Sequence, residues 1–242
     1  MRLLLLADVH ANWEALLSLQ RAEAQPDAVL FAGDAVGYGP DPAHCARWLA
    51  HNATLTVRGN HDAALADETA PPAHLPPELA EAARETLAYA RQALTAEDRA
   101  ALARWPLTAA ATYGGARFLL VHGTPADPLG GQLDPATCAE AELERLFANV
   151  PADVIVVGHT HVPALRRFRD KLIVNPGSLG QPRYGVADAT FAVWQDGRVQ
   201  IHHLHYDHDA PAQRLRLGPY SPEVVEQLVQ ILETGLVPQP AD

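Results

Sequence analysis

Five short polar blocks, spread between residues 8 and 161, carry the residue types that bind divalent metals. Each block directly follows an apolar run, and its polar members are carboxylates, imidazoles and amides, all of which are ligands for Mn, Fe, Zn and Ni. A single histidine after an apolar strand is usually a core or capping residue, whereas five blocks in the same context predict a metal centre. The blocks are Asp8-x-His10, Gly33-Asp34, Gly59-Asn60-His61-Asp62, His122 and Gly158-His159-Thr160-His161.

Apolar runs precede these blocks and are typical of strands buried on both faces of a sheet. Helical patterns lie between the first of them, one after an Asn12 cap and one over Pro42–Ala50. Strands that alternate with helices predict an α/β fold, in which the strands end at one edge and bring distant residues together there. The strands before the blocks are expected at residues 3–7, 28–32, 54–57, 118–121 and 154–157.

The remaining segments follow other patterns. Helices are expected over about Glu78–Leu94, from Thr95, from Asp134-Pro135 to about Phe147, and from Ser221-Pro222 to near Gly235. The first two of these helices follow a proline-rich segment, and together these features predict a helical cap inserted at about residues 67–106. Short antiparallel strands are expected at residues 165–168, 171–174, 190–194 and 199–204.

In order, the five blocks read DxH, GD, GNH, a lone H and GHxH, and this series resembles the calcineurin-like metallophosphoesterase superfamily. The continuation over residues 175–183, NPGSLGQPR, is similar to the small bacterial and archaeal phosphodiesterase branch of that superfamily. The resemblance implies a four-layer α/β/β/α sandwich with a small helical cap insertion. It also implies a single domain over residues 1–242, with metal-dependent phosphoesterase activity.

By motif position, the resemblance implies two divalent metal ions that share Asp34. The set expected for one ion is Asp8, His10, Asp34 and His161. The set expected for the other is Asp34, Asn60, His122 and His159. Two ions about 3.5–4 Å apart polarise phosphoryl oxygens and deprotonate a bridging water for in-line attack on phosphorus. Mn is the preferred metal, with Fe, Zn and Ni as alternatives, and His61 is expected to stabilise the transition state or protonate the leaving oxygen.

The chain departs from the GDxVDRG form of the second block, which is found in the protein phosphatases and the symmetrical dinucleoside tetraphosphatases of the superfamily. In that form the second Asp orients the histidine of GNH and the Arg grips phosphate, whereas this chain has Gly37 and Tyr38 at those positions. The group that orients His61 is therefore left open. Substrate-contacting and turn-forming roles are both open for Asn175, Ser178 and Arg183, of which Arg183 is a candidate for the missing phosphate-gripping arginine.

These features together predict a hydrolase that cleaves phosphodiesters of small organic or nucleotide substrates. A phosphomonoesterase and a dinucleoside polyphosphate hydrolase are alternatives that would use the same ions and the same histidine. A non-catalytic binding scaffold is a third, although relatives of that kind tend to lose metal ligands, and every block is intact here.

Net charge and composition limit the classes of partner that the protein is expected to bind. The 242 residues carry a formal net charge of −11, which argues against binding to long nucleic acid. The apolar start is interrupted by Asp8, and no apolar run reaches the length of a membrane span, so a cytoplasmic protein without a membrane partner is expected. The oligomeric state is left open. A histidine cluster at residues 202–208 is expected to be a strand edge followed by a turn and not a third metal site.

Overall fold

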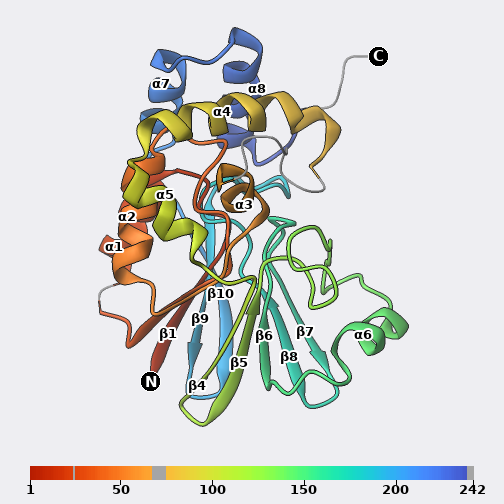
Figure 1. The fold of residues 1–242 in the computed structure, drawn as a ribbon. Coiled ribbons are helices and arrows are strands. Elements are labelled where there is room, and N and C mark those ends of the chain that lie inside the picture. Colours follow the sequence, from red (N-terminus) through yellow and green to blue (C-terminus); the bar gives the residue numbers. More distant parts are fainter. Residues whose placement is uncertain (24, 67–74, 239–242) are drawn as a thin grey trace.

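Two five-stranded sheets face each other in the computed structural model, which describes residues 1–23, 25–66 and 75–238 (Figure 1). Each sheet has three parallel strands flanked by antiparallel ones. The first sheet has the order β10 (Arg198–Leu204), β9 (Ala189–Gln195), β1 (Arg2–Leu6), β2 (Ala28–Phe31) and β3 (Leu55–Thr56). The second has the order β4 (Thr108–Tyr113), β5 (Ala116–Val121), β6 (Val154–Val156), β8 (Lys171–Asn175) and β7 (Ala164–Phe168).

The strands are apolar on both faces because each face packs against another layer. On β1, Leu3 and Leu5 point between the sheets and belong to the same cluster as Phe118 of β5. Leu4 and Leu6 point the other way and pack under the helices of the first sheet. This two-sided burial accounts for the continuous apolar runs of the sequence, and it confirms the four-layer α/β/β/α sandwich.

Helices cover the outer faces of both sheets. Those that share an apolar cluster with the first sheet are α1 (Trp13–Ala22), α2 (Pro42–Asn52), α3 (Asn60–Ala66), α4 (Ala80–Ala93) and α5 (Ala96–Ala103). The second sheet is covered by α6 (Glu140–Phe147). The remaining helices are the 3-10 turn η1 (Pro77–Leu79), α7 (Asp209–Leu217) and α8 (Pro222–Thr234). None of the helices in the described residues is long and apolar enough to cross a membrane.

Local signals set several helix starts where the sequence predicts them. The Asn12 side chain accepts a hydrogen bond from the Ala15 amide at the start of α1, at 3.1 Å. Thr95 and Asp98 form a reciprocal capping box at the start of α5. α4 and α5 fall within the predicted cap insertion, of which residues 67–74 lie outside the described residues. The assignment of this segment as a cap stays a prediction.

Four elements differ from the sequence-based expectation. The helix predicted from Asp134 begins six residues later, at Glu140, because Asp134 closes a local turn by accepting bonds from the Ala136 amide and the Thr137 hydroxyl, at 2.9 and 2.8 Å. Strand β4 was not predicted; it is a half-exposed edge strand joined to β5 by a Gly114-Gly115 turn. Helices α3 and α7 were not predicted either.

Candidate metal centre

The polar blocks meet where the strands of both sheets end. Asp8 and His10 follow β1, Asp34 follows β2, His122 follows β5, and the GHTH block follows β6, while Asn60 and His61 begin α3. The chain turns sharply at these points, with left-handed φ values at Asp8, His10, Asp34, His159 and His161. Such a conformation is costly for a residue other than glycine, about 1–2 kcal/mol each. The backbone is therefore strained where the functional side chains converge.

Three of the histidines present the same ring nitrogen to the centre. Each one uses Nδ1 to donate a hydrogen bond to a backbone carbonyl, which directs Nε2 inward. The bonds run from His10 to Val36 O (3.0 Å), from His122 to Ala32 O (2.8 Å) and from His161 to Gln181 O (2.6 Å).

The inward-facing atoms are too electron-rich to be stable neighbours without a cation. The Nε2 atoms of His10 and His161 lie 3.1 Å apart, and burial lowers the pKa of both imidazoles well below the usual value, so neither carries a proton to share. Asp8 Oδ1 lies 3.6 Å from His161 Nε2. Opposed lone pairs beside a carboxylate fit a bound divalent cation.

A second set of acceptors lies on the other side of Asp34. The Oδ2 atom of Asp34 is 3.7 Å from His10 Nε2 and 3.4 Å from His122 Nε2, so this carboxylate stands between the two sets. Asn60 Oδ1 lies 3.0 Å from His122 Nε2. The Nε2 atom of His159 is buried and has no hydrogen-bond partner among the described residues. The second set also fits a cation.

Burial and the two carboxylates govern the pKa values in the centre. Burial lowers the pKa of His61 to about 4 and that of His159 to about 3, and it raises the pKa of Asp8 to about 7. Burial also opposes protonation of His122, but the Asp34 carboxylate outweighs it and raises the pKa of His122 to about 9. His122 in turn overcomes burial and holds the pKa of Asp34 well below its usual range. The centre therefore attracts positive charge.

Among the described residues, ligand atoms within 4.8 Å of one another form three groups. These groups are Asp8–His10–His161, Asp8–Asp34–His122 and His10–Asp34–His61. The first lies within one predicted ligand set. The second joins Asp34 and His122 of the other predicted set to Asp8, which was predicted for the first ion only. The third also contains His61, so geometry alone admits His61 as a ligand as well as a catalytic group. His159 falls in none of the three groups, although its side chain lies beside His122, with ring centroids 5.1 Å apart.

Two of the three predicted substrate contacts lie behind the metal centre. Asn175 is fully buried, and its amide donates to Gly158 O and Thr160 Oγ1, at 3.0 and 2.9 Å. Ser178 is also fully buried and donates to Asp8 O at 2.6 Å. The protein itself engages these polar atoms, which is what a turn-forming role requires, and a substrate contact by either residue stays a prediction.

Arg183 instead borders the opening of the centre. A pocket of about 270 Å³ is lined by Asp34, Asn60, His61, His159 and His161 together with Tyr38, Leu75, Pro76, Gln132, Thr160, Arg183 and Val237. The Arg183 guanidinium donates to Gln181 Oε1 and lies 5.2 Å from the centre of the Tyr38 ring. Among the described residues that line the pocket, Arg183 is the one with a permanent positive charge. Its position suits a contact with substrate phosphate.

Asp62 is a site residue whose role the sequence did not reveal. It is fully buried, and its carboxylate accepts bonds from the amides of Asp34, Ala35 and Gly59, at 2.9, 2.9 and 3.1 Å. These bonds fix the GD block against the GNH block. They also commit both carboxylate oxygens to backbone donors, so Asp62 supplies no partner for the His61 ring. Its place in the first turn of a helix was the available signal.

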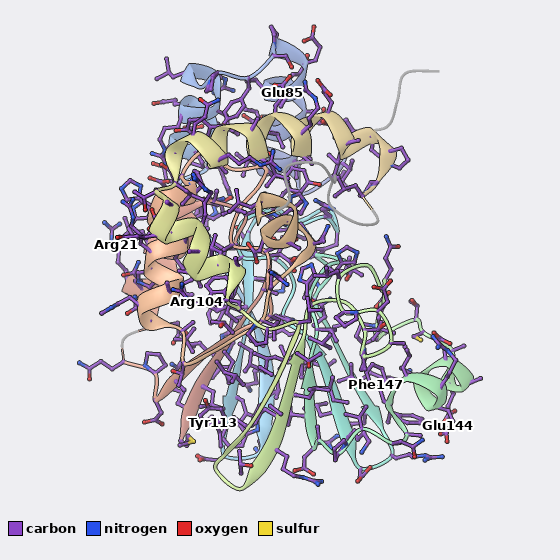
Figure 2. All side chains as sticks on the ribbon, viewed as in Figure 1. Arg21, Glu85, Arg104, Tyr113, Glu144 and Phe147 are labelled. Atoms are coloured by element: carbon purple, nitrogen blue, oxygen red, sulfur yellow. The ribbon has the colours of Figure 1, made fainter. Side chains whose placement is uncertain are left out.

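Figure 2 shows that the labelled charged side chains of Arg21, on α1, and Glu144, on α6, lie at the rim of the molecule. The histidines at 202–208 likewise lie outside the metal centre. His203 Nδ1 contacts the Tyr184 hydroxyl at 3.1 Å, and His205 Nδ1 contacts Asp188 at 3.1 Å. No candidate metal group among the described residues includes these histidines.

Two facing sheets with a carboxylate- and imidazole-rich centre where their strands end define the metallophosphoesterase class of α/β/β/α proteins. The model of the calcineurin-like phosphoesterase superfamily domain matches residues 1–195, and the chain belongs to that superfamily. Membership indicates a metal-dependent phosphoesterase, a hydrolase. It leaves the substrate undefined.

Similar proteins extend the match over most of the chain. An uncharacterized protein of Methanocaldococcus jannaschii is 26% identical over 229 residues, which cover 84% of this chain and 86% of that protein. A metallophosphoesterase structure from Sphaerobacter thermophilus is 27% identical with a TM-score of 0.79, covering 98% and 99% of the two chains. A hypothetical protein from Pyrococcus horikoshii, 24% identical, has the same fold with a TM-score of 0.79, covering 94% and 97%.

Proposed function

We propose that this protein hydrolyses phosphate esters with two divalent metal ions, and that it prefers phosphodiesters of small organic or nucleotide substrates. The observation that carries the proposal is the convergence of imidazole Nε2 atoms and carboxylate oxygens on both sides of Asp34. A lone structural cation would need only one such set. Two sets that share one carboxylate are the arrangement that supports a pair of ions.

The ligand assignment follows from this geometry and from the motif positions. Asp8, His10 and His161 are proposed to hold one ion, and Asn60, His122 and His159 the other, with Asp34 common to both. Manganese is the preferred metal, and iron, zinc or nickel also suit these nitrogen and oxygen donors. Bound divalent ions would polarise the phosphoryl oxygens and lower the pKa of a water for attack on phosphorus.

His61 is proposed as the catalytic residue at the pocket. Burial lowers the pKa of His61 to about 4, so its ring is neutral near pH 7 and donates a single N–H. That N–H would stabilise charge on a phosphoryl oxygen or on the leaving oxygen. Arg183, at the pocket edge, is proposed to bind a non-bridging phosphate oxygen with its planar fork of donors.

The preference for diesters is supported by residues 175–183, NPGSLGQPR, which resemble the small bacterial and archaeal phosphodiesterase branch of the superfamily. Arg183, the last residue of that segment, lines the pocket with a permanent positive charge that suits a phosphate. Residues 1–242 are proposed to form one domain, while a cytoplasmic location is predicted from the sequence alone.

The test combines metal analysis with a substrate panel. The purified protein is stripped of metal, reloaded with Mn²⁺ and assayed for bound metal by inductively coupled plasma mass spectrometry. Two equivalents are expected. Turnover is then compared on bis(p-nitrophenyl) phosphate, p-nitrophenyl phosphate, a 2′,3′-cyclic nucleotide and diadenosine tetraphosphate. The diesters should give the highest kcat/KM, and a higher value for the monoester or the polyphosphate would overturn the proposed preference.

Variants link turnover to the centre. Asp34→Asn should lose bound metal and activity together. His61→Ala should keep both metals and lose about 10²–10⁴-fold in kcat, the usual contribution of a positioned acid or base. His203→Ala serves as the matched control, because it removes an imidazole outside the centre and should leave kcat unchanged. If either Asp34→Asn or His61→Ala hydrolysed substrate at the wild-type rate, the assignment of the active site would be wrong.

A further inference from the structure

The ring of His61 is fixed without a hydrogen bond to its inner nitrogen. His61 is 2% exposed, and its Nδ1 atom is buried with no hydrogen-bond partner among the described residues. Backbone occupies the space beside that atom: a Cβ added to Gly37, which has a φ of +86°, would overlap His61 Nδ1. A carboxylate on that side of the ring would have no room in the present backbone. Packing must therefore hold the ring.

Two rings pack against His61: that of His10, at 4.9 Å between ring centres, and, closer, that of Tyr38. Its ring centre lies 4.5 Å from that of His61, with the planes inclined at 56°, and 4.9 Å from that of His10, inclined at 58°. Tyr38 is itself 2% exposed. Its hydroxyl is buried on the side of the Arg183 guanidinium. The contact with His61 is thus made by the aromatic face and edge, at distances typical of favourable ring pairs.

Tyr38 is in turn held from three directions. Its backbone amide, in a left-handed conformation with a φ of +58°, donates to Thr86 Oγ1 at 2.9 Å, and Thr86 lies on α4. Its side chain belongs to the apolar cluster formed with Leu79 and residues of α4, α7 and α8. The guanidinium of Arg183 covers its ring at 5.2 Å. A ring clamped in this way can act as a rigid support for groups that touch it.

We propose that Tyr38 is a positioning residue that sets the orientation of His61 and of Arg183 at once. The inference rests on the proposed catalytic role of His61. Gly37 and Tyr38 occupy the two positions where the GDxVDRG form has an orienting carboxylate and a phosphate-gripping arginine. In this chain the Tyr38 ring orients His61 by packing against it, and the guanidinium of Arg183 packs on the same ring.

The test compares Tyr38→Leu, which removes the ring, with Tyr38→Phe, which removes only the hydroxyl. Tyr38→Leu should lower kcat about 10–100-fold, since small misplacements of catalytic groups have effects of this size. It should also raise KM severalfold, because Arg183 loses its support, while bound Mn²⁺ stays at the wild-type level. Tyr38→Phe should recover most of the lost kcat. In the His61→Ala background, Tyr38→Leu should lower kcat no further.

A structural readout makes the result independent of turnover. A crystal structure of Tyr38→Leu should show the His61 ring rotated or in two orientations, with the metal ligands in place. Phe147→Leu is the matched control, because Phe147 is a fully buried aromatic residue on α6, far from the centre (Figure 2). It should lose stability and keep kcat.

Each outcome separates the inference from the proposed function. If His61→Ala leaves kcat unchanged, the proposed function fails. If His61→Ala lowers kcat but Tyr38→Leu behaves like Phe147→Leu, the positioning role is wrong. If Tyr38→Phe loses as much kcat as Tyr38→Leu, the hydroxyl acts and not the ring, which also overturns the inference.

Discussion

Replacement of Asp62 by alanine should destabilise the protein by about 3–5 kcal/mol. The Asp62 carboxylate accepts three backbone hydrogen bonds in a fully buried setting: Oδ2 from the amides of Asp34 and Gly59, and Oδ1 from the amide of Ala35. Each buried donor left without a partner costs about 1–3 kcal/mol. Three donors set an upper bound of about 9 kcal/mol, and water entering the vacated space reduces it to the range expected here.

Asp62→Asn should destabilise the protein less than Asp62→Ala does, and the hydrogen-bond geometry gives the size of the difference. Two amides share Oδ2, so an asparagine whose side-chain oxygen takes that place satisfies both of them. Its NH₂ group then faces the Ala35 amide, so that this amide and the new NH₂ group are both left without an acceptor. We therefore expect a loss of about 2–4 kcal/mol, below an upper bound of about 6 kcal/mol for two buried donors without partners.

Urea unfolding followed by circular dichroism, with EDTA present, measures these losses without any contribution from bound metal. Glu97→Ala is the control, because Glu97 is an exposed carboxylate on α5 and its removal should change the free energy of unfolding by less than about 0.5 kcal/mol. If Asp62→Ala costs less than about 1 kcal/mol, the three bonds do not hold the GD and GNH blocks together, and the reasoning is refuted.

Three further predictions concern the centre and the surface. Gly37→Ala should lower kcat at least about tenfold while the metal content stays full, because the added Cβ would overlap His61 Nδ1 and displace a catalytic group. Steady-state kinetics combined with metal analysis tests this prediction. Hydrogen bonds from Arg47 lower the pKa of Asp98 to about 2, so the stability that this carboxyl contributes is present above its unfolded pKa of 3.8 and is lost as pH falls through about 2. Urea unfolding at pH 4 and pH 2 should accordingly show a smaller drop for Asp98→Asn than for the wild type. Mn²⁺ at 100 times its Kd should add about 2.7 kcal/mol of stability; a thermal shift that is the same in Asp34→Asn would contradict the ligand assignment.

The parts of the site that sequence reasoning found are those fixed by local signals. A buried strand that ends in a polar residue requires the chain to turn there, and both features are adjacent in the sequence. Asp8 and His10 after β1, and His122 after β5, are found in this way. The cap at Asn12 is equally local, since its side chain bonds an amide three residues ahead. The fold class followed from the alternation of these elements.

The parts that were missed depend on contacts between distant segments. The backbone carbonyl of Gln181 accepts the hydrogen bond that orients the ring of His161. The position of a backbone carbonyl cannot be inferred from the residue types in the sequence. In the sequence, Tyr38 is an ordinary aromatic residue in a glycine-rich turn. Its proposed positioning role is suggested only by its contacts with Thr86 and Arg183, which are distant in the sequence. The late start of α6 has a similar origin, because Asp134 is an equally good residue for a helix cap and for a tight turn.

The support of the centre extends beyond the segment matched by the family model, which ends at residue 195. Arg214 on α7 bonds Glu14 on α1 and lies 2.8 Å from Asp41, which follows the turn that carries Asp34 and Tyr38. Apolar residues of α7 and α8 pack in one cluster with Tyr38. Because this turn is held on one side by α4 and on the other by α7, its strained backbone is fixed by helices that supply no predicted ligand. The precision of the centre is therefore a property of the whole layer of helices above the sheets, and not of the strand ends alone.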